Sequence, residues 1–180
     1  ADIAIKNDRI IAIGNLENAT AIQTIDAKGN YVSPGFIDPH SHAGNGLIAA
    51  DRSHAQPLLA QGVTTVIINP DGRSPMDLQQ QKEDLLAHQL GINAIPLVGH
   101  GSVRQTVLGM EDRLATAAEM SEMKALVQQA MQDGAYGIST GPFYSPGSFS
   151  NTNELIELSK VVAEYDGVYT SHIRDESNYT

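Results

Sequence analysis

Two histidines separated by one residue, His40 and His42, carry the clearest chemical signal in the sequence. They end an apolar run that begins at Pro34, and a glycine-rich stretch, residues 43–46, follows them. In an extended strand, side chains at positions i and i+2 point to the same face, so the two imidazoles would lie side by side, with Asp38 on that face. Two neutral imidazoles that converge on one point are half of a first-row transition-metal site. The alternative is a surface loop that happens to contain two histidines.

The elements that must position these histidines alternate between strand and helix. Apolar and β-branched runs predict strands at residues 36–40, 63–68, 92–98, 135–140 and 168–171. Amphipathic spacing predicts helices at residues 53–61, 74–90, 116–133 and 153–165. This alternation predicts a parallel sheet with helices outside, either a barrel or a doubly wound sheet. The barrel is favoured, because no glycine-rich phosphate loop follows the first strand.

Several local signals refine this pattern. Ser74 before a proline is expected to cap one helix, and Thr116 with Glu119 predicts a capping box. The methionine-containing apolar stripe of that second helix is interpreted as core. His54 and His88 fall in predicted helices away from the strand ends, and we give them no role.

The opening of the chain has a different pattern. Residues 2–13 predict a hairpin around Asn7-Asp8, and further β segments are expected at residues 20–26 and 31–33 around a turn at 28–30. We therefore predict two domains: a small β unit in residues 1–33 and the start of a barrel in residues 34–180. Five strands do not close an eight-stranded barrel, which needs at least about 200 residues. The chain is therefore expected to be part of a longer protein.

Composition limits the classes of partner. A formal net charge of −10 argues against nucleic acid and anionic membranes as partners. The chain has no cysteine, so any metal must be held by histidine and carboxylate. No apolar run approaches the ~20 residues of a membrane span, and the first residues lack the charged-then-apolar pattern of a signal peptide, so we expect neither. The cytoplasm is favoured, with the periplasm as the alternative because the first residues resemble the middle of a longer sequence.

Further polar residues follow the other predicted strands, at the edge where barrels place their sites. Asp71 could be a metal ligand or part of an Asn-Pro-Asp-Gly turn, and His172 a further ligand or a hydrogen-bonded pocket residue. His100 could line the substrate pocket or bond a loop. Tyr144, in a glycine- and proline-rich loop, could donate to a substrate carbonyl or pack under the loop. Arg174 could pair with a substrate carboxylate or with its acidic neighbours.

The segment Pro-Gly-Phe-Ile-Asp-Pro-His-Ser-His at residues 34–42, after the β unit, resembles the start of an amidohydrolase-superfamily enzyme. Four later segments follow in the right order. Together they resemble the N-acyl-D-amino-acid deacylase (D-aminoacylase) branch, and they lie at residues 62–66, 99–104, 137–147 and 171–176.

This resemblance implies a distorted TIM barrel beside a β-sandwich and a zinc site with one or two ions, other divalent metals being alternatives. His40 and His42 match the ligands of the first strand, and His172 matches a ligand of the other metal position. The deacylases usually carry a cysteine in an Asn-Cys-Gly turn, and Asp71 would replace that thiolate by a harder carboxylate. A later histidine ligand and an aspartate general base have no counterpart before Thr180.

We therefore expect metal-dependent hydrolysis of a carbon–nitrogen bond, the deacylation of small-molecule N-acyl-D-amino acids by a metal-activated hydroxide. Tyr144 would help to hold the developing oxyanion. The alternatives are another amidohydrolase, acting on a cyclic amide as dihydropyrimidinases do or on a dipeptide, and an inactive fragment or homologue that serves as a structural module. We expect these residues alone to be inactive. The sequence is compatible with a homo-oligomer and leaves the substrate side chain and acyl group open.

Overall fold

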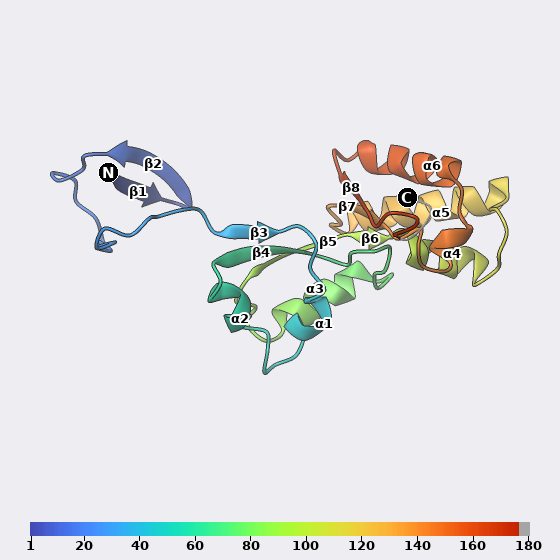
Figure 1. The fold of residues 1–180 in the computed structure, drawn as a ribbon, viewed down its shortest axis with the longest axis horizontal. Coiled ribbons are helices and arrows are strands. Elements are labelled where there is room, and N and C mark those ends of the chain that lie inside the picture. The colour runs from blue at the N-terminus through green and yellow to red at the C-terminus, as the bar shows by residue number, and fades with distance from the viewer. Residues whose placement is uncertain (177–180) are drawn as a thin grey trace. The chain divides into compact units, whose positions relative to one another are not determined.

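The computed structural model describes residues 1–176, and the chain divides into two compact units (Figure 1). The first unit is Ala1–Pro34 and the second begins at Gly35. In the part of the chain that the structure describes, no helix has both the length and the apolar character that crossing a membrane requires.

The first unit contains an antiparallel hairpin of β1 (Asp2–Lys6) and β2 (Arg9–Gly14). Asn7 and Asp8 connect the strands, with left-handed φ angles of 49° and 58°. Positive φ at both central residues is what a two-residue type I′ hairpin turn requires. The predicted hairpin is therefore confirmed.

The further β segments expected in this unit, at residues 20–26 and 31–33, are wrong. These residues form irregular backbone with a bend at residue 22, and Ile22 and Ile25 are exposed. The structure pairs no other segment of the first unit with them, and an alternating sequence forms no stable strand without a hydrogen-bonded neighbour. That residues 1–33 belong to a β-sandwich stays a prediction.

The second unit contains two three-stranded parallel sheets. The first has the order β3 (Phe36–Asp38), β4 (Val63–Ile68) and β5 (Asn93–Pro96). The second has the order β6 (Val98–Gly99), β7 (Gly137–Thr140) and β8 (Val168–Ser171).

The two sheets share one bent strand. The strand predicted at residues 92–98 is observed as β5 and β6 on either side of Leu97. Leu97 N donates to Ile68 O of β4 at 3.2 Å, and Pro96 O accepts from Tyr136 N, just before β7, at 2.9 Å. The strands therefore neighbour one another in chain order and all pair parallel, as successive strands of a β/α barrel do.

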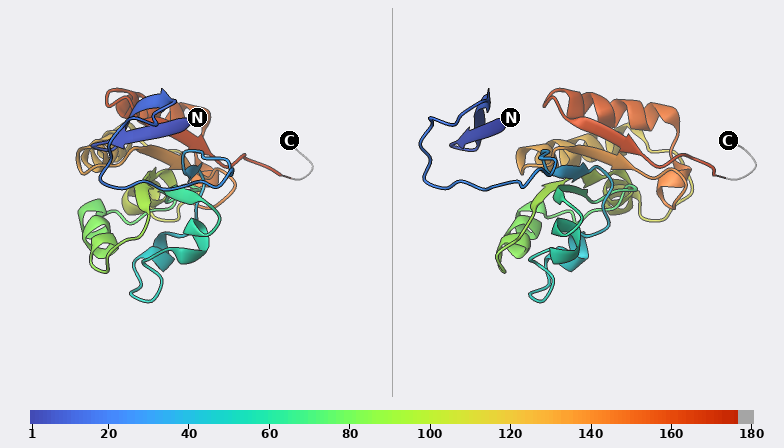
Figure 2. Two further views of the ribbon diagram at one scale, coloured as in Figure 1. Left: turned by 90° about the vertical axis from the view of Figure 1, so that its left-hand side faces the viewer. Right: turned by 60° about the vertical axis from the view of Figure 1, so that its left-hand side comes forward.

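Helices connect the strands, with α1–α3 beside the first sheet and α4–α6 beside the second (Figures 1 and 2). Their bounds are α1 Gly44–Leu47, α2 Gln56–Leu59, α3 Leu78–Leu86, α4 His100–Leu108, α5 Ala117–Gln132 and α6 Thr152–Ala163, with a 3-10 turn η1 at Gly147–Phe149.

The capping predictions had mixed outcomes. The capping box of Thr116 and Glu119 at the start of α5 is confirmed. Ser74 does not cap α3: Asp77 does, accepting from Gln80 N at 2.8 Å. The Ser74 hydroxyl is already engaged, because it accepts from Gly99 N at 2.9 Å and so ties this loop to β6. The helix expected from residue 53 begins only at Gln56, after a left-handed residue.

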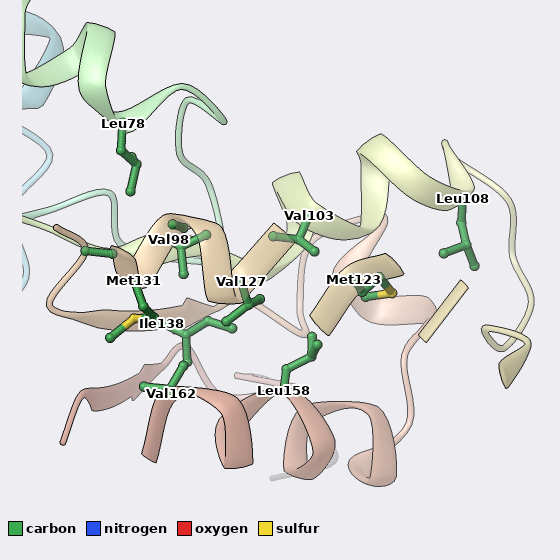
Figure 3. Packing of buried hydrophobic residues seen from close by; sticks show 12 residues of the cluster. Leu78, Val98, Val103, Leu108, Met123, Val127, Met131, Ile138, Leu158 and Val162 are labelled. Carbon is green, nitrogen blue, oxygen red and sulfur yellow. The ribbon is translucent and has the colours of Figure 1, made fainter. Parts of the chain in front are cut away.

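The larger core lies between α4, α5, α6 and the second sheet (Figure 3). Val98, Val127 and Leu158 meet there with no exposed surface, and Met123 lies among them. The interpretation of the methionine stripe as core is confirmed. A smaller cluster surrounds β4 with residues Leu47, Ala55, Val66, Ile68, Leu85 and Ile92. Both cores hold the carboxyl ends of the strands in fixed positions.

Candidate metal centre

His40 and His42 lie directly after β3, where strand pairing still continues. Ser41 N donates to Ile67 O of β4 at 2.9 Å, and Ser41 itself is buried. The histidines on either side of it are exposed at 51% and 71% of their side-chain surface. Their rings approach edge to face with centroids 5.3 Å apart. The structure therefore brings the two imidazoles together, as the one-residue spacing predicts.

Asp71 enters the same space from the loop after β4. Its carboxylate Oδ2 lies 3.4 Å from His40 Nε2 and 3.2 Å from His42 Nε2. The ligand atoms of the three side chains all lie within 4.8 Å of one another. We call these three residues the metal triad.

The metal triad suits a divalent cation. Two imidazole nitrogens and a carboxylate oxygen are a common ligand set for zinc, whose bonds to them of about 2.0–2.2 Å set neighbouring ligand atoms roughly 3.3 Å apart in a tetrahedron. The observed separations of 3.2 and 3.4 Å agree with that spacing. The other oxygen, Asp71 Oδ1, is buried without a hydrogen-bond partner. Since an unpaired buried acceptor costs free energy, this atom also favours a bound cation.

The backbone that carries Asp71 is packed too closely for ordinary side chains. A Cβ placed on Gly72 would lie 2.8 Å from Gly141 N, and one on Gly99 would lie 2.6 Å from the Gly72 carbonyl carbon. Gly72 N also donates to Ser139 Oγ at 3.1 Å, and that hydroxyl donates to Asn69 O at 2.6 Å. Asp71 itself has a left-handed φ of 57°. The loop is therefore a rigid platform for its carboxylate.

A cavity of about 780 Å³ opens beside the metal triad. His42 and Asp71 line it from one side, and Tyr144 lines it from the loop after β7. The Tyr144 hydroxyl makes no hydrogen bond to any residue that the structure describes. The volume falls in the range of about 300–1,000 Å³ that small-molecule sites occupy. A small substrate could therefore contact the metal triad and the phenol together.

His172 does not join the metal triad in the described structure. Its Nε2 lies 3.2 Å from Glu176 Oε1, and its ring stacks on Phe143 with centroids 5.4 Å apart. Tyr144 contacts the same ring edge to face. Arg174 donates from Nη1 to Ser148 O at 3.3 Å and does not line the cavity. Their roles as metal ligand and carboxylate partner stay predictions.

His100 lies in the core instead of lining the cavity. It begins α4, has no exposed surface, and its Nε2–H donates to Glu154 Oε1 at 2.8 Å. Arg104, one turn later, donates to Glu154 Oε2 at 2.6 Å and also to the backbone carbonyl of Arg113. The expectation that His100 contacts substrate is thus corrected. We call His100, Arg104 and Glu154 the buried triad.

Opposing effects act on the pKa of the Glu154 carboxyl. Burial alone would raise it, but hydrogen bonds from His100 and Arg104, with their charges, lower the pKa below its usual value. Glu154 is therefore ionised at neutral pH, and Arg104 balances its charge. This is the arrangement that a buried carboxylate needs to be tolerated in a core.

Two residues, Arg73 and Glu154, were not predicted from the sequence to have a role. Arg73 lines the cavity two residues after Asp71, and its position at a strand end could have identified it. Glu154 was assigned only to a helix, and nothing local indicates its distant partners. For His100 a signal did exist: the buried residues of α4, His100, Val103, Arg104 and Leu108, follow the spacing of one helical face.

The chain is similar in sequence to proteins of one known family. The amidohydrolase family matches residues 23–166. D-aminoacylase from Alcaligenes xylosoxydans xylosoxydans is 36% identical over 99% of the chain, and N-acyl-D-aspartate deacylase from the same organism is 35% identical over 99%. The aligned region is 41% of the first relative and 40% of the second, so the chain spans about two fifths of their length.

Solved structures show the same relation. A crystal structure of D-aminoacylase superposes with a TM-score of 0.83 at 36% identity, over 97% of this chain and 41% of the other. N-acyl-D-glutamate deacylase from Bordetella bronchiseptica, complexed with zinc and a phosphonate inhibitor, superposes with a TM-score of 0.84 at 32% identity, again over 97% and 41%. The predicted α/β barrel-type fold is confirmed for the part of a barrel that the chain contains.

Proposed function

The chain belongs to the amidohydrolase family, and from that premise we propose that it carries the metal-binding half of an enzyme that deacylates N-acyl-D-amino acids. The observation that carries the proposal is the metal triad, with its unpaired Asp71 Oδ1, at the edge of a large cavity. The D-aminoacylase and deacylase relatives support the substrate class, and the zinc in the Bordetella bronchiseptica structure supports the ion.

The residues of the chain have separate tasks in this proposal. His40, His42 and Asp71 hold a divalent cation, which when bound supplies Lewis-acid chemistry toward water and an amide carbonyl. Both imidazoles are exposed, so a cation held by them would be within reach of a substrate. The rigid loop around Gly72 keeps the Asp71 carboxylate in place, so little reorganisation is needed when the cation binds.

Tyr144 is the proposed oxyanion donor. Its hydroxyl is free of protein partners among the described residues, and its ring is held between Phe143 and His172. A pre-positioned donor is most effective where negative charge develops on the carbonyl oxygen. We keep His172 as a proposed ligand of a second ion, because it follows a strand that ends at the same edge of the sheet. The metal triad alone carries the proposal.

The chain offers little support for a cyclic-amide hydrolase with a bridging carboxylated lysine. No lysine lines the cavity among the residues that the structure describes. The position after β4 that would receive a bridging ligand already holds Asp71.

Metal analysis and a substrate screen on the full-length protein that contains this chain test the proposal. We expect one or two zinc ions per polypeptide and hydrolysis of N-acetyl-D-amino acids in preference to the L-enantiomers. Asp71→Ala should lose metal and activity together, because it removes the carboxylate shared by both histidines. Full-length protein that binds no metal and hydrolyses neither enantiomer would contradict the proposal.

A further inference from the structure

The cavity wall carries very few charges. Among the described residues that line it, Asp71 and Arg73 are the two with permanent charges, and the others are mainly glycine, proline, serine and amide side chains. If Asp71 is engaged by a cation, Arg73 is the remaining charge that faces the cavity. A chain with 21 acidic residues and 11 basic ones thus presents a cation at this place.

The Arg73 guanidinium has no protein partner to neutralise it. It makes no hydrogen bond or ion pair with any residue that the structure describes, and its side chain is exposed. Arg104 and Arg113, by contrast, are paired with Glu154 and Glu119. Arg174, for which the sequence leaves a substrate carboxylate and the acidic neighbours as alternative partners, donates to a backbone carbonyl.

The backbone of Arg73 is fixed although its side chain is exposed. Arg73 N donates to Pro70 O at 3.2 Å, and the preceding carbonyl, Gly72 O, accepts from Ser102 N at 3.1 Å. The next residue, Ser74, donates from its backbone N to Ser102 Oγ at 2.9 Å. Hydrogen bonds to α4 and β6 thus hold the backbone around Arg73, and the guanidinium moves only by rotation about the side-chain torsions.

The spacing from the metal triad matches a small substrate. Two residues of backbone span at most about 7 Å, so the Cα atoms of Asp71 and Arg73 cannot lie farther apart than that. An N-acyl amino acid carries a carboxylate a few bonds from its amide carbonyl. A guanidinium recognises a carboxylate through two parallel N–H donors, which adds geometric specificity to charge.

We propose that Arg73 binds a carboxylate of the N-acyl amino acid while the amide lies at the metal triad; this rests on the proposed function above. The carboxylate can be the α-carboxylate of any N-acyl amino acid or the side-chain carboxylate of an acidic one. Arg73 is then a specificity residue of the cavity, and Arg174 is not required for carboxylate recognition.

The test is calorimetric binding to the zinc-loaded full-length protein, with hydrolysis measured separately. The ligands are N-acetyl-D-alanine, N-acetyl-D-alaninamide, N-acetyl-D-glutamate and N-acetyl-D-glutamine. Arg73→Gln should weaken carboxylate binding by about ten- to a hundredfold, as expected for a lost charge-assisted hydrogen bond. Arg73→Lys should recover part of the affinity, and zinc content should not change.

The four ligands separate the two sources of carboxylate. If the α-carboxylate is recognised, Arg73→Gln weakens N-acetyl-D-alanine but not its amide. If the side-chain carboxylate is recognised, it weakens N-acetyl-D-glutamate but not N-acetyl-D-glutamine. Arg52→Gln, which removes an exposed partner of Asp51 away from the cavity, is the matched control and should bind all four like the wild type.

Two results overturn the inference: equal affinities of the wild type and Arg73→Gln for every ligand, or a loss found with Arg174→Gln in place of Arg73→Gln. Arg73-dependent binding without any hydrolysis by the wild type would support the inference and refute the proposed function. Hydrolysis by the wild type without Arg73-dependent binding would support the proposed function and refute the inference.

Discussion

The metal triad and the buried triad are built from similar parts and have opposite environments. Each joins one carboxylate to two basic side chains, and each draws on residues at the carboxyl ends of strands. In the buried triad both oxygens of Glu154 are hydrogen-bonded and all three residues are at least 98% buried. In the metal triad both histidines are exposed and Asp71 Oδ1 has no partner.

That difference separates a structural cluster from a binding one. The buried carboxylate has its acceptors satisfied within the protein, so it has no capacity for a ligand and every partner is needed. The exposed carboxylate has an unused oxygen beside two accessible imidazoles, so a cation can complete it. Residue types alone do not distinguish the two clusters, whereas the burial of the side chains and the hydrogen bonds to the carboxylate oxygens do.

The largest effect should come from breaking the buried triad. Glu154→Gln leaves Arg104 and His100 without an anionic partner in the core, and we expect a loss of about 3–5 kcal/mol in the free energy of unfolding. Chemical denaturation measures it. Glu157→Gln, three residues along α6, is the matched control: it pairs with Lys124 and Lys160 at the surface, and its loss should be much smaller. Equal losses would mean that the buried triad stabilises the fold no more than the surface ion pairs of Glu157 do.

A smaller effect, present only with metal, should come from the metal triad. Zinc at a hundredfold excess over its dissociation constant should stabilise the wild type by about 2.7 kcal/mol. His40→Ala and His42→Ala should lose this gain and, without metal, differ from the wild type by only about 0.5 kcal/mol, because both side chains are exposed.

Thermal unfolding with zinc and with a chelator checks this expectation. Glu154→Gln should keep the zinc-dependent gain wherever it still folds, and His88→Ala, an exposed histidine away from the cavity, should keep it in full. A gain that survives both triad substitutions would place the ion elsewhere.

The smallest effect should be a difference in the pH at which the two triads lose their contributions to the free energy of unfolding. The pKa of Glu154 is lowered in the folded protein, so its contribution is fully present above the usual value of 4.5 and is lost as pH falls below it. On acidification the zinc-dependent gain should be lost before the contribution of Glu154, because protonated imidazoles do not bind metal. Unfolding free energies measured against pH should show two steps with zinc and only the lower step without it. In Glu154→Gln the lower step should be absent, and its persistence would assign it to another carboxyl.

Much of the scaffold was predictable because its signals are local. β8 has the predicted bounds, 168–171, and β4 the predicted 63–68, since each is an apolar run between turn residues. The capping box at Thr116 is equally local. The helix α4 escaped notice because its N-cap is a glycine, without a side chain that caps. Once α4 is recognised, the helical spacing of His100 and Arg104 predicts that they face the core.

The site was predictable in part for the same reason. The i, i+2 spacing of His40 and His42 determines that they meet, and parallel strands bring Asp71 to the same edge. Which strand-end residues touch depends on loop conformation, which spacing does not determine. His172 therefore ends a strand at the right edge but stacks on Phe143, while Arg73 faces the cavity.

The close backbone packing around Gly72 has a consequence for how this site can change. The glycines at positions 72, 99 and 141 leave no room for a β-carbon, so a substitution at any of them must displace backbone. Asp71, the proposed ligand next to Gly72, has no such restriction beyond its left-handed φ. The side chain at position 71 can therefore change while the backbone that presents it stays the same. A thiolate or another carboxylate at this position would alter the metal preference, provided the three glycines are retained.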